Sequence, residues 1–279
     1  MRTSLEKGEK TSPFPPQADP HAAAVARAFA PLASPALDAD FLAACRGAYS
    51  VHMGVENAAV VLYSLVRFLK PRRVLEVGAG YTSLWILRAL ADNDAELERI
   101  RSLQRRGEAQ LLNWPWTVQD VVDDYDAVAA RLVCVDDCAH QSEAASSIPA
   151  IAKTLHMDAY FDFAKGDAWH MDDLYNTEAF DMFWLDFGVG TRVSDFVEKI
   201  WPAIKPGGYL VCHSTVTNEH TRVWLDALRA RAPKAVTGID PDHVTHVSFL
   251  EPHKRFQNAL SVLQKRPPGF AEPLYSVSA

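Results

Sequence analysis

Long apolar runs, paired cysteines and a surplus of positive charge are all missing from this sequence. No run of eighteen apolar residues occurs, so we expect no membrane-spanning helix. The net charge is −7, whereas nucleic-acid binding needs a basic face, so we expect no nucleic-acid partner. The four cysteines form no CxxC pair and have no zinc-like spacing. No secretory leader is recognisable, and we expect a cytoplasmic protein in a reducing compartment.

Alternating strand-like and helix-like segments are what the sequence does contain. Apolar residues make up 48% of the chain, enough to bury a large core. Periodicity predicts helices at residues 20–30, 38–48, 55–69, 82–90, 142–155, 194–204 and 219–232. It predicts strands at residues 73–77, 131–136, 159–164, 181–186, 209–213, 243–250 and 257–264, with a turn at residues 205–208 that leads into the fifth strand. The alternation indicates a parallel sheet covered on both faces, and the last two strands indicate an antiparallel hairpin.

One α/β domain with attachments is the predicted organisation. We expect residues 1–20 to be a flexible tail, 21–70 a helical cap, 71–266 the α/β domain and 267–279 a second tail. Within that domain, residues 93–130 are predicted to be a helical insertion. Its helical stretches are broken at residues 113–116, and we expect Trp114 and Trp116 there to form part of a lid over the site.

Glycines follow the first predicted strand, in the sequence Glu76-Val-Gly-Ala-Gly80. A backbone that turns sharply beneath a ligand needs positions without a Cβ, and open α/β sheets bind ligands beyond the carboxyl ends of their strands. A dinucleotide site would need a small residue at position 83, which Ser83 matches poorly. It would also need an acid about twenty residues on, after a second strand. The second strand comes much later here, so the pattern disfavours NAD.

Several strand ends taken together resemble the class I S-adenosylmethionine-dependent methyltransferases. The resemblance rests on residues 73–83, Asp136 after the second strand, Gly166-Asp167-Ala168 after the third, Asp186 after the fourth, and residues 205–210 at the fifth. It extends over about residues 55–265. It implies an α/β fold with a doubly wound, mostly parallel seven-stranded sheet, an antiparallel last strand and N-terminal helices, and S-adenosylmethionine as the cofactor.

The resemblance also implies roles for individual residues at the strand ends. Gly78 and Gly80 would let the backbone pack under the methionine and ribose portions. Asp136 would accept hydrogen bonds from the ribose hydroxyls, and Asp167 from the adenine amino group beside the N–H of Ala168. Glu76 would brace the loop or reach the cofactor through water. The complete set of expected cofactor residues is Glu76, Gly78, Gly80, Tyr81, Thr82, Asp136, Gly166, Asp167, Ala168 and Asp186.

Fewer residues are candidates for the chemical step. His213 ends the fifth strand and could take a proton from a hydroxyl or amine, although it could equally be a hydrogen-bonded strand-end residue. Asp186 would orient substrate or cofactor. Aromatic faces attract a sulfonium, which adds Tyr175 to the catalytic candidates and makes Tyr81 a second tyrosine of interest. His140 and His170 are weaker candidates for the base, and each is more readily explained as structural.

We predict no metal, because the Asp-Asn pair of the metal-dependent O-methyltransferases is not evident after the fifth strand. The leading hypothesis is methylation of an oxygen, nitrogen or carbon atom on a small molecule held in line with the sulfonium. One alternative keeps the cofactor but cyclises it to azetidine-2-carboxylate, releasing methylthioadenosine. Another is a cofactor-binding protein without catalysis. A homodimer is possible under each hypothesis.

Overall fold

The computed structural model describes residues 34–49, 54–107, 128–139, 144–176, 179–186 and 188–267. The predicted helix at 20–30, the tail at 1–20, the two lid tryptophans and His140 lie outside the described residues. So does all but the first residue of the tail predicted at 267–279. Among the described residues, no helix is both long enough and apolar enough to cross a membrane.

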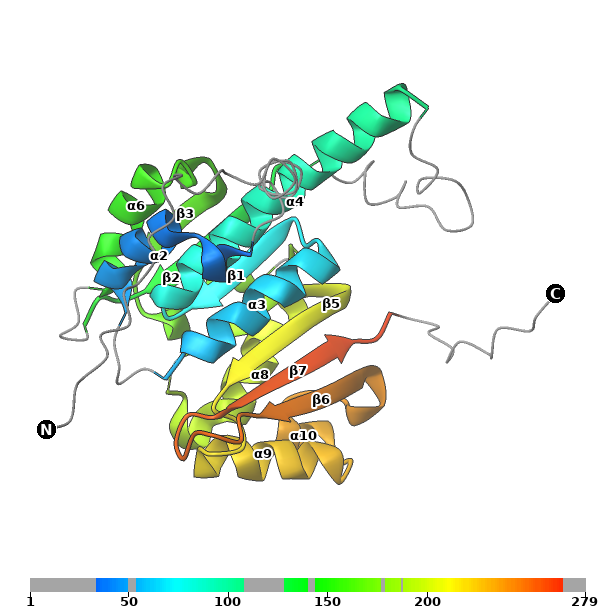
Figure 1. The fold of residues 1–279 in the computed structure, drawn as a ribbon. Coiled ribbons are helices and arrows are strands. Elements are labelled where there is room, and N and C mark those ends of the chain that lie inside the picture. The colour runs from blue at the N-terminus through cyan, green and yellow to red at the C-terminus, as the bar shows by residue number, and fades with distance from the viewer. Residues whose placement is uncertain are drawn as a thin grey trace, which may run out of the picture.

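A seven-stranded sheet in the order β3-β2-β1-β4-β5-β7-β6 forms the centre of the molecule (Figure 1). Five strands are parallel, namely β1 (Arg73–Val77), β2 (Arg131–Asp136), β3 (Phe161–Lys165), β4 (Phe180–Leu185) and β5 (Ile204–His213). Strand β7 (Ala259–Lys265) is antiparallel to β5 and to β6 (Val244–Leu250). Strand order therefore reverses between β1 and β4, where doubly wound sheets bind their ligands. This architecture confirms the predicted fold class.

Helices cover both faces of the sheet, and alternate residues of each strand face opposite layers. In β1, Val74 belongs to one buried cluster and its neighbour Leu75 to the other, as the period of two in a strand requires. The first cluster contains residues of α2 (Ala39–Cys45), α3 (Glu56–Leu69), α4 (Tyr81–Arg105) and α6 (Ala144–Thr154). The second contains residues of α7 (Asp172–Tyr175), α8 (Val193–Ile200) and α9 (Glu219–Arg229), next to which lies α10 (Lys234–Thr237).

Helix α4 differs from the prediction, because it runs without interruption from Tyr81 to Arg105 (Figure 1). The sequence suggested a helix ending near residue 90 and a separate insertion from residue 93. Polar contacts with α3 explain the continuation. Asn93 is completely buried and its Nδ2 donates to the carbonyl oxygen of Val66 at 2.9 Å. Asp92 accepts a hydrogen bond from Tyr63, and Glu96 pairs with Arg67.

The predicted turn at residues 205–208 is also wrong, because these residues already belong to β5. The pairing of β5 with β4 shifts register between Phe180 and Met182. Glycine permits the irregularity, since Gly207 has a φ of +84° and a Cβ on Gly208 would lie 2.9 Å from the carbonyl oxygen of Asp181. The strands at residues 73–77 and 131–136 have the predicted bounds, and the remaining predicted elements within the described residues are present with shifted ends.

Candidate active site

A glycine turn that faces open space connects strand β1 to α4. Gly78 has a φ of +96°, a conformation that residues with a Cβ rarely adopt. Its N–H donates to the carbonyl oxygen of Val135 at 3.0 Å, which ties the turn to the end of β2. A Cβ placed on Gly80 would meet no atom within 4 Å. The turn thus has room on its outer side for a ligand, as the glycine pattern predicts.

Two of the predicted cofactor residues, Glu76 and Thr82, are buried beneath this turn. Thr82 Oγ1 donates to Glu76 Oε1 at 2.7 Å, and the thiol of Cys134 lies 2.9 Å from Glu76 Oε2. Trp184 Nε1 donates in turn to Thr82 Oγ1 at 3.2 Å. Burial raises the pKa of Glu76 to about 7, against the hydrogen bonds from its neighbours. Both side chains brace the turn from inside, and a contact with the cofactor stays a prediction for them.

Asp136 joins the ends of the first three strands. Its Oδ2 accepts the N–H of Ala79 in the glycine turn at 2.9 Å, and its Oδ1 accepts the N–H of Cys138 at 2.7 Å. Its own carbonyl oxygen accepts the N–H of Gly166 at 2.9 Å, beyond β3. A carboxylate can accept about four hydrogen bonds, so acceptor capacity remains for the hydroxyls of a ribose.

The end of β3 presents Gly166, Asp167 and Ala168 at the same edge. A Cβ on Gly166 would lie 2.2 Å from Cε of Met171, so the side chain of Met171 would have to move for any other residue. Asp167 Oδ1 accepts the N–H of Trp169 at 2.9 Å, while half of the Asp167 side chain remains exposed. Ala168 is buried. His170, one of the weaker candidates for the base, has a side chain that is 81% exposed, 3.6 Å from Asp167.

The two tyrosines considered for the sulfonium lie in packed surroundings. Tyr175 is 2% exposed, its hydroxyl donates to the carbonyl oxygen of Ala168 at 3.0 Å, and its ring packs near Phe183 and Phe196. Tyr81 is half-buried and makes ring contacts with Tyr49 and Trp85 at the start of α4. Tyr175 therefore has no hydroxyl proton free for catalysis in this structure, and its predicted catalytic role gains no support.

Asp186 and His213 form a buried pair at the ends of β4 and β5. His213 Nδ1 lies 2.8 Å from Asp186 Oδ1, and their side chains are 5% and 14% exposed. The N–H of Asp186 donates to the carbonyl oxygen of Val77, which fixes the carboxylate beside the glycine turn. His213 Nε2 is buried without a hydrogen-bond partner among the described residues. An ionised carboxylate only accepts, so Nδ1 of neutral His213 carries the proton and Nε2 is a free acceptor.

Asp186 also sets the protonation of His213. Burial by itself lowers the pKa of His213, but the hydrogen bond and negative charge of Asp186 outweigh burial and raise it above its ordinary value of 6.5. The main chain of Gln257 raises it further, and the charge of Lys254 opposes the rise. The imidazole is thus a stronger base than a free histidine and is neutral only above this raised pKa.

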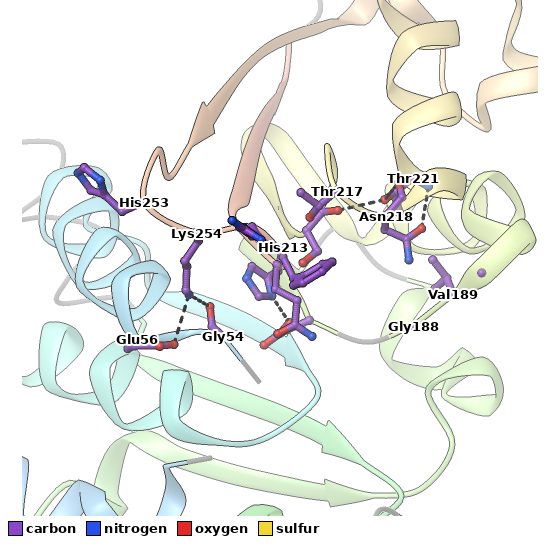
Figure 2. A pocket seen from close by; sticks show the side chains of 16 residues that line it. Gly54, Glu56, Gly188, Val189, His213, Thr217, Asn218, Thr221, His253 and Lys254 are labelled. Carbon is purple, nitrogen blue, oxygen red and sulfur yellow. Dashed lines mark hydrogen bonds and ion pairs between the residues drawn. The ribbon is translucent and has the colours of Figure 1, made fainter. Parts of the chain in front are cut away.

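A cavity of about 830 Å³ opens over the Asp186–His213 pair (Figure 2). Ligand sites commonly span about 300–1,000 Å³, so the size suits a small molecule. Its lining comes from residues 54 and 56, from 186 and 188–190, from parts of 213–221, and from 253–257. Of these, sequence reasoning identified only Asp186 and His213.

The missed lining residues are in four places: at the start of α3, just beyond β4, between β5 and the first turn of α9, and in the β6–β7 loop. For the β6–β7 loop, the predicted hairpin was the one signal in the sequence, but the sequence does not say that β7 pairs with β5. That pairing brings residues 253–257 to the mouth of the cavity. No group of three or more His, Cys, Asp or Glu side chains is placed to hold a metal ion within the described ranges.

The fold and the strand-end residues define a class of protein: a doubly wound α/β protein with a glycine turn after β1 and acids at the ends of β2, β3 and β4. A family model described as "Methyltransferase domain" matches residues 75–215, from β1 to just beyond β5. The chain belongs to this family and is a class I S-adenosylmethionine-dependent methyltransferase.

Solved structures with the same fold are distant in sequence. An O-methyltransferase TomG from Streptomyces achromogenes, involved in tomaymycin synthesis and solved with SAM, is 17% identical with a TM-score of 0.52, covering 87% of this chain and 96% of that one. A putative O-methyltransferase from Klebsiella pneumoniae is 16% identical with a TM-score of 0.54, covering 88% and 95%. An O-methyltransferase from Bacillus cereus in complex with SAH is 13% identical with a TM-score of 0.52, covering 87% and 97%. At these identities the likeness is one of fold. No curated protein sequence matches the chain.

Proposed function

We propose that this enzyme methylates a hydroxyl group of a small molecule, with His213 as the general base. The observation that carries the proposal is Nε2 of His213, a buried acceptor without a hydrogen-bond partner in the described structure, on a residue that lines the 830 Å³ cavity. A hydroxyl is a weak nucleophile until its proton is removed, so an oxygen acceptor gains most from such a base.

The edge formed by β1, β2 and β3 is where we place the cofactor. The open side of Gly80, the unused acceptor capacity of Asp136 and the half-exposed carboxylate of Asp167 are compatible with its methionine, ribose and adenine portions. When bound, S-adenosylmethionine supplies an electrophilic methyl group and leaves as a neutral thioether. Asp186 lies between this edge and the cavity, because its N–H is bonded to Val77 while its carboxylate holds His213.

Each member of the pair has a separate task in this proposal. Asp186 keeps the proton on Nδ1 and orients the ring, so that Nε2 faces the acceptor. Nε2 then takes the hydroxyl proton as the acceptor oxygen forms its bond to the methyl carbon. Asp186 stabilises the imidazolium that results.

Two measurements test the proposal. Isothermal titration should detect binding of S-adenosylmethionine and S-adenosylhomocysteine, and no binding of NAD. Incubation with the cofactor and candidate hydroxylated acceptors, followed by mass spectrometry, should then yield S-adenosylhomocysteine and an O-methylated product. Absence of cofactor binding would overturn the proposal.

The cyclase alternative predicts methylthioadenosine from the cofactor alone. Its two grounds are the aromatic residues near the glycines and Asp167 and the lack of an evident base, whereas Tyr175 lies in the core and the Asp186–His213 pair offers a base. No observation favours it, and the released nucleoside distinguishes the two reactions.

A further inference from the structure

The charged side chains that line the cavity do not all have partners. Two acids line it, Glu56 and Asp186, together with the basic residues His213, His253, Lys254 and Arg255. Asp186 is paired with His213. Lys254 Nζ bonds to the carbonyl oxygen of Gly54 and lies 3.4 Å from Glu56, as Figure 2 shows. It also lies 3.6 Å from Glu251, outside the lining, which accepts a hydrogen bond from Asn57.

Once these ion pairs are assigned, Arg255 remains as the permanently charged basic residue of the cavity lining. It lies exposed in the β6–β7 loop, and no hydrogen bond or ion pair links it to another described residue. A guanidinium carries five donors in a planar fork that matches a carboxylate or a phosphate. The whole chain has a net charge of −7, so the positive charge of Arg255 at the cavity wall is opposite in sign to the net charge of the protein.

The loop that carries Arg255 is held in place by two contacts with the start of α3. Besides the Lys254 bonds, Gly54 and Gln257 approach so closely that a Cβ on Gly54 would lie 2.5 Å from Oε1 of Gln257. Both residues have positive φ, +63° for Gly54 and +47° for Gln257. Arg255 is therefore presented from a loop that docks on the start of α3, and it lines the same cavity as His213.

Other features of the cavity suit the same kind of ligand. The N-terminus of α9 lines it through Asn218 and Thr221, and Asn218 caps this eleven-residue helix by accepting the N–H groups of His220 and Thr221. The positive end of a helix dipole favours an anion nearby. Phe256, next to Arg255, is 80% exposed and offers an apolar surface at the rim.

We propose that the cavity selects an acceptor that carries an anionic group, a carboxylate or a phosphate, in addition to the hydroxyl that is methylated. Arg255 binds the anionic group and His213 Nε2 receives the hydroxyl proton. This substrate class rests on the proposed function, because it takes the cavity as the acceptor site.

Matched probes test the charge preference without knowledge of the natural acceptor. Protein saturated with S-adenosylhomocysteine is titrated calorimetrically with 4-hydroxybenzoate, with its neutral amide 4-hydroxybenzamide, and with phenyl phosphate. We expect the anions to bind about fivefold more tightly than the amide, the scale of one exposed bidentate ion pair. Comparison of the two anions shows whether carboxylate or phosphate is preferred. The preference should shrink as salt is raised.

Substitutions then assign the preference to one side chain. Arg255→Ala should bring the benzoate and the amide to equal affinity, and Arg255→Glu should favour the amide. Arg99→Ala removes the same charge from an exposed position on α4 outside the cavity and should leave the preference intact.

Equal binding of benzoate and amide by the wild type, no binding of any probe, or a preference that survives Arg255→Glu would each overturn the inference. Each of these results would leave the proposed methyl transfer standing if S-adenosylhomocysteine still binds. Failure of S-adenosylhomocysteine itself to bind would instead overturn the proposed function, and the same probes titrated alone would still test Arg255.

Discussion

The carboxyl edge of the sheet has two halves that are built in different ways. At the ends of β1, β2 and β3, polar side chains are used mainly to hold main chain and turn, as with Asp136 on Ala79 and Asp167 on Trp169. At the ends of β4 and β5 and in the β6–β7 loop, His213 Nε2 has no partner, and Arg255 has no bond to another described residue. We propose that the first half forms a cradle for the cofactor and that the second keeps polar groups for an acceptor.

The halves also differ in how the chain supplies them. The cradle comes from residues 76–168, each group directly after a strand, whereas the cavity draws on segments from residue 54 to residue 257. Substitutions should therefore separate them. Changes in the cradle should affect cofactor affinity or stability, and changes in the cavity should affect turnover.

The largest effect is expected from His213→Ala. Loss of the base should lower turnover by roughly 10²–10⁴-fold with an acceptor that the wild type methylates. Affinity for S-adenosylhomocysteine, measured by calorimetry, should change little, because His213 belongs to the cavity. His170→Ala is the control, since His170 is exposed and lies outside the cavity lining. Full activity in His213→Ala would remove the base from the mechanism.

Asp186→Asn should lower turnover by about 10²-fold and also move its pH dependence. In the wild type, kcat/KM should fall as pH drops through the raised pKa of His213, because the base becomes protonated. Asparagine removes the charge that raises this pKa while burial still lowers it, so the acid limb should move to lower pH. Asp195→Asn, on exposed α8 surface, should leave the profile unchanged. An unmoved acid limb in Asp186→Asn would contradict the assignment of that limb to His213.

Asp136→Ala should weaken S-adenosylhomocysteine binding by about 1–3 kcal/mol, the cost of losing hydrogen bonds to a charged acceptor. The variant should also be less stable, because Asp136 holds the N–H groups of Ala79 and Cys138. Asp137→Ala is the matched control, since the carboxylate of Asp137 is exposed and, among the described residues, accepts only the N–H of Ala139. Calorimetry and thermal unfolding measure the two effects. Equal affinity in both variants would remove Asp136 from the ribose site.

The last effect, expected from Glu76→Gln, concerns stability alone and appears in its pH dependence. The pKa of Glu76 rises from 4.5 to about 7 on folding, so the folded state retains a proton that the unfolded chain releases. This stabilisation is complete below pH 4.5 and is lost as pH rises through about 7, on the order of 2–3 kcal/mol. Urea unfolding at about pH 5 and about pH 8 should show this decline in the wild type but not in Glu76→Gln. An equal loss of stability in the wild type and in Glu76→Gln would show that a group other than Glu76 titrates in this pH range.

Local sequence was sufficient for the strand-end residues because each depends on its own strand and turn. Gly78 is predicted from the need for a turn without a Cβ, and its φ of +96° agrees. Asp136, Asp186 and His213 were placed correctly at strand ends, since a short apolar strand followed by a polar residue is a local pattern. Their binding and catalytic roles stay predictions until the experiments above are done.

Contacts between distant segments explain the two elements, α4 and β5, whose bounds the local pattern did not predict. The sequence predicts helical structure on both sides of residues 91–92, and α4 runs through them as one helix, with Asn93 and Glu96 bound by α3, some 26 to 29 residues earlier in the chain. The glycines at 207 and 208 are typical of a turn, but pairing with β4 includes them in β5 as an irregular stretch of strand. In both cases contacts between elements, and not the local pattern, decided where an element begins or ends.

The sequence by itself determined the alternation of strands and helices, the glycine turn and the acids at the ends of β2, β3 and β4, because each is encoded within a few adjacent residues. Only the tertiary structure decided that Asp186 and His213 meet at 2.8 Å, and that Lys254 and Gln257 dock on residues 54–56 to close one side of the cavity. The physical reason is strand order. Placing β4 beside β5, and β7 beside β5, depends on burying two apolar faces at once, which no short stretch of sequence specifies.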